Sequence, residues 1–271
     1  MATATTEATL LPAVLAAVRE AGHLILAQRD GGLRIDTKGD GSPVTCADHA
    51  SHHCLVDHLK RLTPAWPVFS EESGALPFNI RGRWHHYWLL DPLDGTRAFV
   101  RGTDEFTINV ALIRDGRPVL GVIGVPADGR LYHAVAGGPA HRQLPGQPAE
   151  VIRCGPPSPT PRVTISRSCP TPETAAYLER LGPHTTQPLD SSLKSCRVAE
   201  GGADVYVRLG PTGEWDTAAA QCLLEAAGGG LMDCAGRPLT YNRRATLMNP
   251  HFIAYGAEPE RWLAPLAGTG A

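Results

Sequence analysis

The stretch Asp91-Pro92-Leu93-Asp94-Gly95-Thr96-Arg97-Ala98-Phe99-Val100 decides the interpretation of this chain. It follows an apolar and aromatic run, Trp84–Leu90, which predicts a buried strand. Two carboxylates only three positions apart at a strand end repel each other unless a cation lies between them. The free amides of Gly95 and Thr96, at the start of a possible helix, suit a phosphate. The segment therefore predicts ligands for a hard metal ion beside a seat for an anion.

Composition limits the class of protein. The 271 residues can form one large domain or two modest ones, and the hydrophobic content of 42% with 19% charged residues fits a soluble globular chain. A formal net charge of −2 argues against a general nucleic-acid surface. We expect no transmembrane segment, because no apolar stretch is judged to reach the roughly 18 residues that a span needs. The first residues, 1–7, lack a secretory signal and are expected to fray.

The seven cysteines are scattered, odd in number and without a Cys-x-x-Cys pair. This spacing predicts neither a disulfide framework nor a zinc–thiolate site, and favours a reducing cytoplasm in which most of the thiols are small buried groups.

The first half of the chain predicts two helices followed by a mainly antiparallel sheet. The helices are expected over Ala8–Gln28, stopping at Asp30-Gly31-Gly32, and over Cys46–Leu62, with an exposed Gly- and Asp-rich loop at Asp36–Thr45 between them. Strands are expected at Val68–Glu71, Trp84–Asp91, Phe106–Arg114, Pro118–Pro126 and Arg130–Ala136. The last three are joined by Asp115-Gly116 and Asp128-Gly129, which are strong hairpin signals.

The second half predicts a layer of alternating strands and helices. Gly137–Arg162 is rich in Pro and Gly and is interpreted as the joint between two subdomains, with a short strand at Val151–Cys154. Beyond it we expect strand Val163–Ser166, helix Pro172–Leu181, a segment at Thr185–Leu189, helix Ser192–Glu200, strand Val205–Arg208 and helix Trp215–Ala227. Gly228-Gly229-Gly230 would end that helix and turn the chain. Such alternation favours a mixed or parallel sheet.

Acidic residues gather at the ends of these elements: Asp48, Glu71 and Glu72, Asp91 and Asp94, and Asp216. Carboxylates without a His or Cys partner select hard ions, above all Mg²⁺, and a pair of such ions can hold both oxygens of a phosphoryl transfer. Each piece alone has a plainer interpretation, as a helix-dipole partner, a solvated loop or a turn. His49 and His53, spaced i, i+4, could chelate a metal, but a solvated or partly packed helix face explains the histidines of this helix.

The combination of Glu71-Glu72, Asp91-Pro92-Leu93-Asp94-Gly95-Thr96 and Trp215-Asp216-Thr217-Ala218-Ala219 resembles the inositol monophosphatase superfamily. Within it the chain is most similar to the bacterial bisphosphate nucleotidases, and the likeness runs over nearly the whole chain. The supporting segments are Gly41–Asp48, Val68–Glu72, Tyr87–Thr96, Ile165–Ser168, Ser191–Lys194, Val198–Gly201 and Gly210–Thr212. One departure is Ala98, where such nucleotidases usually carry an acidic residue.

The resemblance implies a fold and a metal site. The fold is α/β (α+β), a five-layer αβαβα sandwich of the inositol monophosphatase/fructose-1,6-bisphosphatase type, with subdomains at 1–155 and 156–271 and the site between them. Glu71, Asp91 and the carbonyl of Leu93 would bind one Mg²⁺, and Asp91, Asp94 and Asp216 a second. A third, weaker ion would involve Asp48 or Glu72.

The remaining candidate residues contact substrate or move a proton. The amides of Gly95 and Thr96 would hold the phosphate, together with Glu71, Leu93, Asp94 and Asp216 around it. Thr96 and Glu71 would orient the attacking water, and Asp48 and Glu72 would share in its proton path. In the second half, Ser191 and Lys194 at a helix start and Arg208 at a strand end are candidates for the other phosphate and the nucleoside.

The implied activity is Mg²⁺-dependent, lithium-sensitive hydrolysis of adenosine 3′,5′-bisphosphate (PAP) to AMP and phosphate in sulfur assimilation, with its 5′-phosphosulfate analogue (PAPS, giving APS) as a second substrate. The implied partner is a small nucleotide, not a nucleic acid, for a cytoplasmic monomer or homodimer, peripheral at the inner membrane in some relatives. The alternatives are an inositol or other sugar monophosphatase and, from another class, a phosphonucleotide or metal sensor without turnover. Rates of phosphate release from the nucleotide and from sugar phosphates, measured side by side, distinguish these three alternatives.

Overall fold

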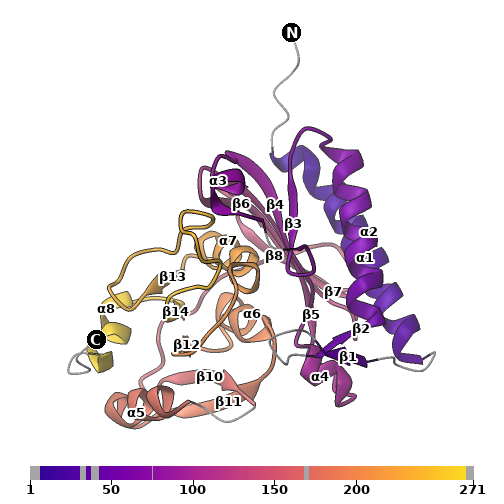
Figure 1. Cartoon of the computed structure of the whole chain (residues 1–271). Helices are drawn as coiled ribbons and strands as arrows, with labels where there is room; N and C mark the ends of the chain where they lie inside the picture. Colours follow the sequence, from indigo (N-terminus) through magenta and orange to yellow (C-terminus); the bar gives the residue numbers. More distant parts are fainter. Residues whose placement is uncertain (1–6, 31–34, 38–42, 75, 168–170, 267–271) are drawn as a thin grey trace.

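The computed structural model describes residues 7–30, 35–37, 43–74, 76–167 and 171–266 (Figure 1). Residues 1–6 of the segment expected to fray lie outside these ranges, and its last residue, Glu7, instead begins a helix. Outside the ranges also lie the Gly31-Gly32 helix stop, the Gly41-Ser42 part of the family-like loop and Cys169. The six described cysteines are all free thiols, in agreement with the expectation of no disulfide framework among them.

A seven-stranded sheet is built from the first half of the chain, in the order β3-β4-β5-β6-β7-β8-β9. Its strands are β3 (Val68–Ser70), β4 (His86–Asp94), β5 (Thr107–Arg114), β6 (Arg117–Val125), β7 (Arg130–Val135), β8 (Ala140–Gln143) and β9 (Glu150–Ile152). All neighbours are antiparallel except β3 and β4. The two Asp-Gly pairs form the predicted hairpin turns, and both Asp115 and Gly116 take the positive φ that a tight hairpin turn requires.

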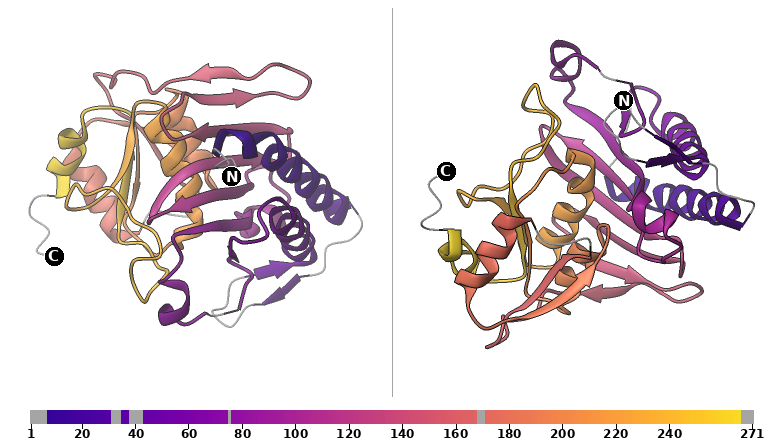
Figure 2. Two further views of the ribbon diagram at one scale, coloured as in Figure 1. Left: turned by 90° about the horizontal axis from the view of Figure 1, so that it is seen from above. Right: turned by 60° about the horizontal axis from the view of Figure 1, so that its bottom comes forward.

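Two long helices, α1 (Glu7–Asp30) and α2 (Cys46–Leu62), lie side by side on one face of this sheet (Figures 1 and 2). Alternate residues of the central strands, such as Trp88, Leu90 and Val110, pack against them, while Leu89 and Ala111 point to the other face. Thr45 and Asp48 form a capping box that starts α2 at the predicted residue.

By length and composition, Glu7–Arg29 is the one helix among the described residues that could cross a membrane, so the expectation that no apolar stretch reaches this length is wrong. The core helix of a soluble protein passes the same test. Leu10, Val14, Val18 and Ile25 of α1 are buried in the core, which is the reason for its apolar composition. The helix therefore does not indicate a membrane protein.

A five-stranded mixed sheet follows, in the order β11-β10-β12-β14-β13. Its strands are β10 (Arg162–Ser166), β11 (Thr185–Leu189), β12 (Val205–Arg208), β13 (Gly230–Asp233) and β14 (Phe252–Tyr255). Helices α6 (Leu193–Ala199) and α7 (Ala218–Ala226) fill the space between the two sheets, and α5 (Pro172–Leu181), α8 (Pro259–Leu263) and the short η2 (Ala264–Leu266) cover the outer face. The layers are therefore αβαβα, which confirms the predicted fold class.

Several boundaries differ from the sequence-based expectation. The expected loop Asp36–Thr45 contains two paired strands, β1 (Ile35–Thr37) and β2 (Pro43–Thr45). Within the expected joint Gly137–Arg162, the predicted short strand at Val151–Cys154 is found as β9, which begins one residue earlier, and an unpredicted strand, β8, precedes it. Both add to the edge of the first sheet, where half-exposed polar side chains suffice.

The predicted helix Trp215–Ala227 is also divided, into the 3₁₀ turn η1 (Glu214–Asp216) and α7. The carboxylate of Asp216 accepts a hydrogen bond from the amide of Gly213 (2.7 Å), which holds the turn separate from the helix. Gly230 belongs to β13, not to a turn. The short helices α3 (Phe78–Arg81) and α4 (Thr96–Val100) complete the fold.

Candidate active site

The end of β4 turns its two aspartates toward one cavity. Asp91 pairs with Asn109 of β5 and Asp94 with Thr107, so β4 carries one extra residue there and forms a bulge. Pro92 lacks an N–H and suits such an interruption of the ladder. Gly95 then takes φ +90, and α4 begins at Thr96. An alanine Cβ at residue 95 would lie 3.0 Å from the carbonyl oxygen of Glu105, so this turn requires glycine.

Three carboxylates from three separate segments meet beside this bulge. One oxygen each of Glu71, after β3, Asp91, in β4, and Asp216, in η1, lie within 4.8 Å of one another. Burial, followed by the charges of Glu71 and Asp94, raises the pKa of Asp91 well above its usual range and that of Asp216 to about 8. Such mutual repulsion is relieved by a cation. The all-oxygen donor set fits Mg²⁺.

Asp94 joins this cluster to the second half of the molecule. Its Oδ2 accepts a hydrogen bond from the hydroxyl of Ser192 (2.8 Å), at the start of α6, and longer ones from Thr107 Oγ1 (3.3 Å) and Asn109 Nδ2 (3.4 Å). Asn109 also donates to Ser192 (2.9 Å). These three residues were not predicted. Thr107 and Asn109 interrupt an apolar strand run, a signal that could have identified them.

Thr96 lies between the cluster and the start of α2. Its hydroxyl lies 3.1 Å from the carbonyl oxygen of Leu93 and 3.3 Å from Oδ1 of Asp48, and it can donate to either. The other oxygen of Asp48 accepts from the amide and hydroxyl of Thr45, both at 2.7 Å. Asp48 is therefore a capping residue that also contacts Thr96. Glu72 lies in the turn after β3, where its amide contacts Ser70.

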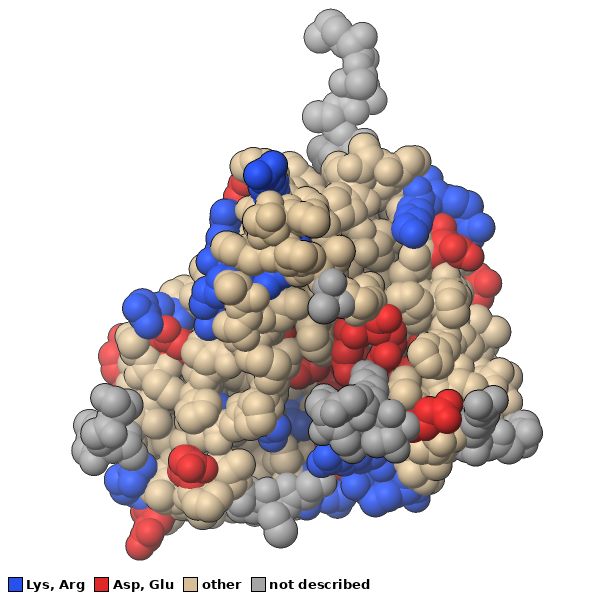
Figure 3. All heavy atoms as spheres, in the orientation of Figure 1, with Lys and Arg blue, Asp and Glu red and all other residues tan. Residues whose placement is uncertain are grey.

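A cavity of about 590 Å³ connects these residues to the second half of the chain. Ten of the twelve predicted site residues line it, namely Glu71, Asp91, Leu93, Asp94, Gly95, Thr96, Ser191, Lys194, Arg208 and Asp216; Asp48 and Glu72 do not. Acidic atoms gather in the hollow between the two sheets, and basic atoms lie below them (Figure 3). The basic side chains that line the cavity, called the basic wall below, are those of Lys194, Arg208, Arg97 and Arg101. Arg97 and Arg101 were not predicted as site residues from the sequence.

Lys194 and Arg208 of the basic wall are held by the protein itself. Lys194 is buried, donates to the carbonyl of Ser191 (2.7 Å) and lies over the ring of Tyr206 (5.3 Å to its centroid). Burial lowers the pKa of Lys194 to about 8, although Asp94 and Asp190 oppose this. Arg208 donates to Ser166 and to the carbonyl of Pro211, and its buried Nε has no partner among the described residues.

A model of the inositol monophosphatase family matches residues 7–265, and the chain belongs to this family. Among its relatives, the 3′(2′),5′-bisphosphate nucleotidase CysQ of Escherichia coli (strain K12) is 44% identical over 246 residues, which cover 90% of this chain and 98% of that protein. The CysQ of Salmonella typhimurium is 43% identical over the same shares. These findings confirm the resemblance and the prediction of a phosphatase.

Solved structures show the same fold. The crystal structure of CysQ from Bacteroides thetaiotaomicron is 36% identical, superposes with a TM-score of 0.78, and the match covers 91% of this chain and 96% of that one. A staphylococcal inositol monophosphatase, only 19% identical, reaches a TM-score of 0.83 over 99% of this chain and 98% of that one, which supports the fold alone.

Proposed function

We propose that this chain is a Mg²⁺-dependent 3′(2′),5′-bisphosphate nucleotidase that converts adenosine 3′,5′-bisphosphate to AMP and phosphate. The observation that carries the proposal is the pairing of two walls in one cavity: a carboxylate cluster of Glu71, Asp91, Asp94 and Asp216 faces the basic residues Lys194 and Arg208. The carboxylate cluster would hold the metal ions that bind the reacting phosphate of a monoester. The basic residues Lys194 and Arg208 would bind a second phosphate on the same nucleotide.

The metal ligands in this proposal are those named from the sequence. Glu71, Asp91 and the Leu93 carbonyl would hold one Mg²⁺, and Asp91, Asp94 and Asp216 another; Asp48 or Glu72 would serve a third. Bound Mg²⁺ supplies positive charge to the phosphoryl oxygens and makes a nearby water more acidic. Thr107, Asn109 and Ser192 fix the orientation of Asp94 through the hydrogen bonds described above.

The chain's own groups would position the water and receive its proton. Glu71, which lines the cavity, would act as the general base. The Thr96 hydroxyl, which can donate to Leu93 or Asp48, would orient the water. Asp48 and Glu72 extend the proton path toward α2. The amides of Gly95 and Thr96 bind the phosphate, and Ser191, Lys194 and Arg208 bind the rest of the nucleotide.

The test is phosphate release from adenosine 3′,5′-bisphosphate with purified protein and Mg²⁺. Asp94→Asn should abolish turnover, whereas Asp128→Asn, an exposed turn residue outside the cavity, should not change it. Wild-type turnover in Asp94→Asn would contradict the metal assignment.

A panel of substrates tests the specificity. It compares the bisphosphate, its 5′-phosphosulfate analogue, myo-inositol 1-phosphate and fructose 1,6-bisphosphate, each with and without Li⁺. Faster release from either sugar phosphate would favour the alternative of a sugar monophosphatase. Tight binding of the nucleotide without release would favour the sensor. We further propose a division into subdomains 1–155 and 156–271, and a cytoplasmic monomer or homodimer, for which size-exclusion chromatography with light scattering gives the oligomeric state.

A further inference from the structure

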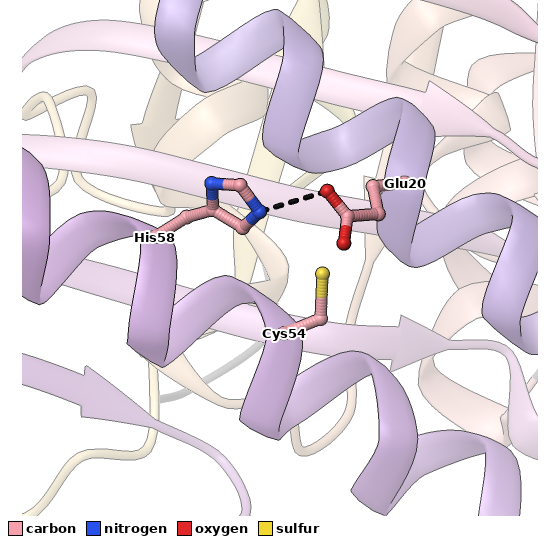
Figure 4. Close-up of side chains that lie close together, drawn as sticks. All are labelled: Glu20, Cys54 and His58. Atoms are coloured by element: carbon pink, nitrogen blue, oxygen red, sulfur yellow. Dashed lines mark hydrogen bonds and ion pairs between the residues drawn. The ribbon is translucent and has the colours of Figure 1, made fainter.

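A second group of metal-ligating side chains lies away from the cavity, between α1 and α2 (Figure 4). It consists of Glu20 on α1 and of Cys54 and His58 on α2. The carboxylate oxygen, the thiol sulfur and the imidazole nitrogen all lie within 4.8 Å of one another. Glu20, Cys54 and His58 point toward a common centre, with Glu20 Oε2 and His58 Nε2 2.8 Å apart.

The geometry of this group comes from the packing of the two helices. Cys54 and His58 are spaced i, i+4 and so lie on one face of α2, and that face packs on α1. A tetrahedral Zn²⁺ holds O, N and S ligand atoms about 3.3 to 3.8 Å apart. The three ligand atoms, which lie within 4.8 Å of one another, are therefore already close to these spacings. The side chains of His58 and Glu20 are 33% and 59% exposed, which leaves access for the ion and room for a water as fourth ligand.

The charges around Cys54 suit a cation. Burial and the carboxylates of Glu20 and Asp57 raise the pKa of this thiol to about 11, with Arg61 opposing them. Without a metal ion the sulfur therefore keeps its proton, and Cys54 is a poor nucleophile. On metal binding the S–H bond is replaced by an S–metal bond and the proton passes to solvent, with no change of oxidation state.

We propose that Glu20, Cys54 and His58 form a binding site for Zn²⁺ that links α1 to α2. The sulfur and imidazole ligands favour Zn²⁺ over Mg²⁺, whereas the all-carboxylate cavity suits Mg²⁺. The site is independent of the reaction proposed above. Because the two helices come from separate stretches of chain and α2 carries Asp48 at its start, a bound ion stabilises the layer that supports one end of the cavity.

The first experiment uses Co²⁺ as a spectroscopic probe. The full-length protein is stripped with EDTA, saturated with Mg²⁺ and titrated with Co²⁺, and the near-ultraviolet band of a cobalt–thiolate bond is recorded. We expect the band to saturate at one Co²⁺ per chain. Zn²⁺ should displace the Co²⁺ and abolish the band, and Cys54→Ser should not show it. His58→Gln and Glu20→Gln should each weaken Co²⁺ binding about tenfold or more. Matched controls on the same helix are Cys46→Ser and His53→Gln, which should keep the band.

A second measurement separates this site from the cavity. Zn²⁺ should raise the melting temperature of the wild type and of Asp94→Asn by several degrees, but not that of Cys54→Ser or His58→Gln. The proposal is overturned if the band persists in Cys54→Ser, if Cys46→Ser removes it, or if Asp94→Asn alone abolishes the thermal shift. The last result would place Zn²⁺ in the carboxylate cavity. Loss of nucleotidase activity has no bearing on any of these readouts.

Discussion

The acidic and the basic wall of the cavity differ in how far the protein itself compensates their charges. The acidic wall brings Glu71, Asp91 and Asp216 together at short range, and burial, followed by the neighbouring carboxylates, raises the pKa of Asp91 and of Asp216. On the basic wall, Lys194 and Arg208 already donate to oxygens of the protein. The acidic wall is therefore costly without a cation, whereas hydrogen bonds within the protein offset part of the cost of burying the basic wall. We expect changes in the first to affect rate and stability in opposite directions, and changes in the second to affect mainly substrate affinity.

The largest expected effect is that of Asp91→Asn. The variant should lower kcat by about 10³-fold or more, because it removes a ligand shared by both proposed ions. In EDTA it should also raise the free energy of unfolding by about 1–2 kcal/mol, because a buried carboxylate that its neighbours repel becomes neutral. Steady-state kinetics and urea unfolding in EDTA measure both, with Asp128→Asn as the control. A variant that is less stable in EDTA would show that the wall is not under repulsion.

The next largest effect is expected at Gly95, in the turn between the two walls. Gly95→Ala should cost about 1–3 kcal/mol of stability and about tenfold or more in kcat/KM, since its Cβ would press on the Glu105 carbonyl and, at 3.2 Å, on Ser191 of the opposite wall. Gly102→Ala is a matched control: Gly102 also has positive φ (+74), but its Cβ would meet no atom within 4 Å. Chemical unfolding and kinetics should separate the two variants. Equal losses would mean that the backbone conformation alone, and not the contact between walls, makes glycine necessary.

The two walls also differ in how far the sequence could predict them. Asp91 and Asp94 stand at the end of an apolar strand, and local pattern alone predicted the pair as metal ligands. That Asp216 joins their cluster depends on how the two sheets pack: its place at the end of an element made it a candidate, and the family resemblance assigned it to the same site. Ser192 could not be assigned from pattern, because a serine at a helix start has many uses, whereas the polar Asn109 interrupts an apolar strand run and could have been identified.

The same limit explains where the fold differs from the prediction and why the sequence did not indicate the proposed Zn²⁺ site. The edge strand β8 was interpreted as part of a linker because exposed edges tolerate polar residues, whereas a short strand was predicted close to β9. The histidines of α2 were interpreted as a surface face because the partner of His58, Glu20, lies on another helix. Spacing within one segment could not show that Cys54 also joins them.

The basic wall has a predicted pH dependence. Lys194 is charged below its pKa of about 8 and neutral above it, so the KM for adenosine 3′,5′-bisphosphate should rise as pH increases from about 8 to about 10, by several-fold. Lys194→Arg keeps its charge over this range and should flatten that rise, whereas kcat should keep the wild-type profile. The measurement is a pH series of KM at saturating Mg²⁺ for both proteins. A rise of the same size in Lys194→Arg would exclude Lys194 as its source.

The smallest expected effect concerns His133, which lies outside both walls and is a buried histidine without a hydrogen-bond partner among the described residues. His133 of β7 is buried, stacks on His141 (5.0 Å between ring centroids), and neither of its ring nitrogens has a hydrogen-bond partner among the described residues. Burial, then the nearby His141 and Arg19, lower the pKa of His133 to about 4. Its neutral form is thus favoured in the folded state, so its contribution to stability is complete above the ordinary pKa of about 6.5 and is lost as the pH falls toward about 4.

His133→Phe should remove this dependence. Between pH 7 and pH 5 the wild type should lose about 1–2 kcal/mol more than the variant, because below pH 6.5 the unfolded chain binds a proton that the folded ring does not. Urea unfolding at the two pH values measures the difference, and His141→Phe, which leaves the buried ring in place, serves as a control that should retain most of the wild-type loss. If His133→Phe and the wild type lose equal stability, then the acid sensitivity arises elsewhere, and the carboxylates of the acidic wall cannot be its source. Their raised pKa values favour protonation in the folded state, and so they stabilise the protein as the pH falls.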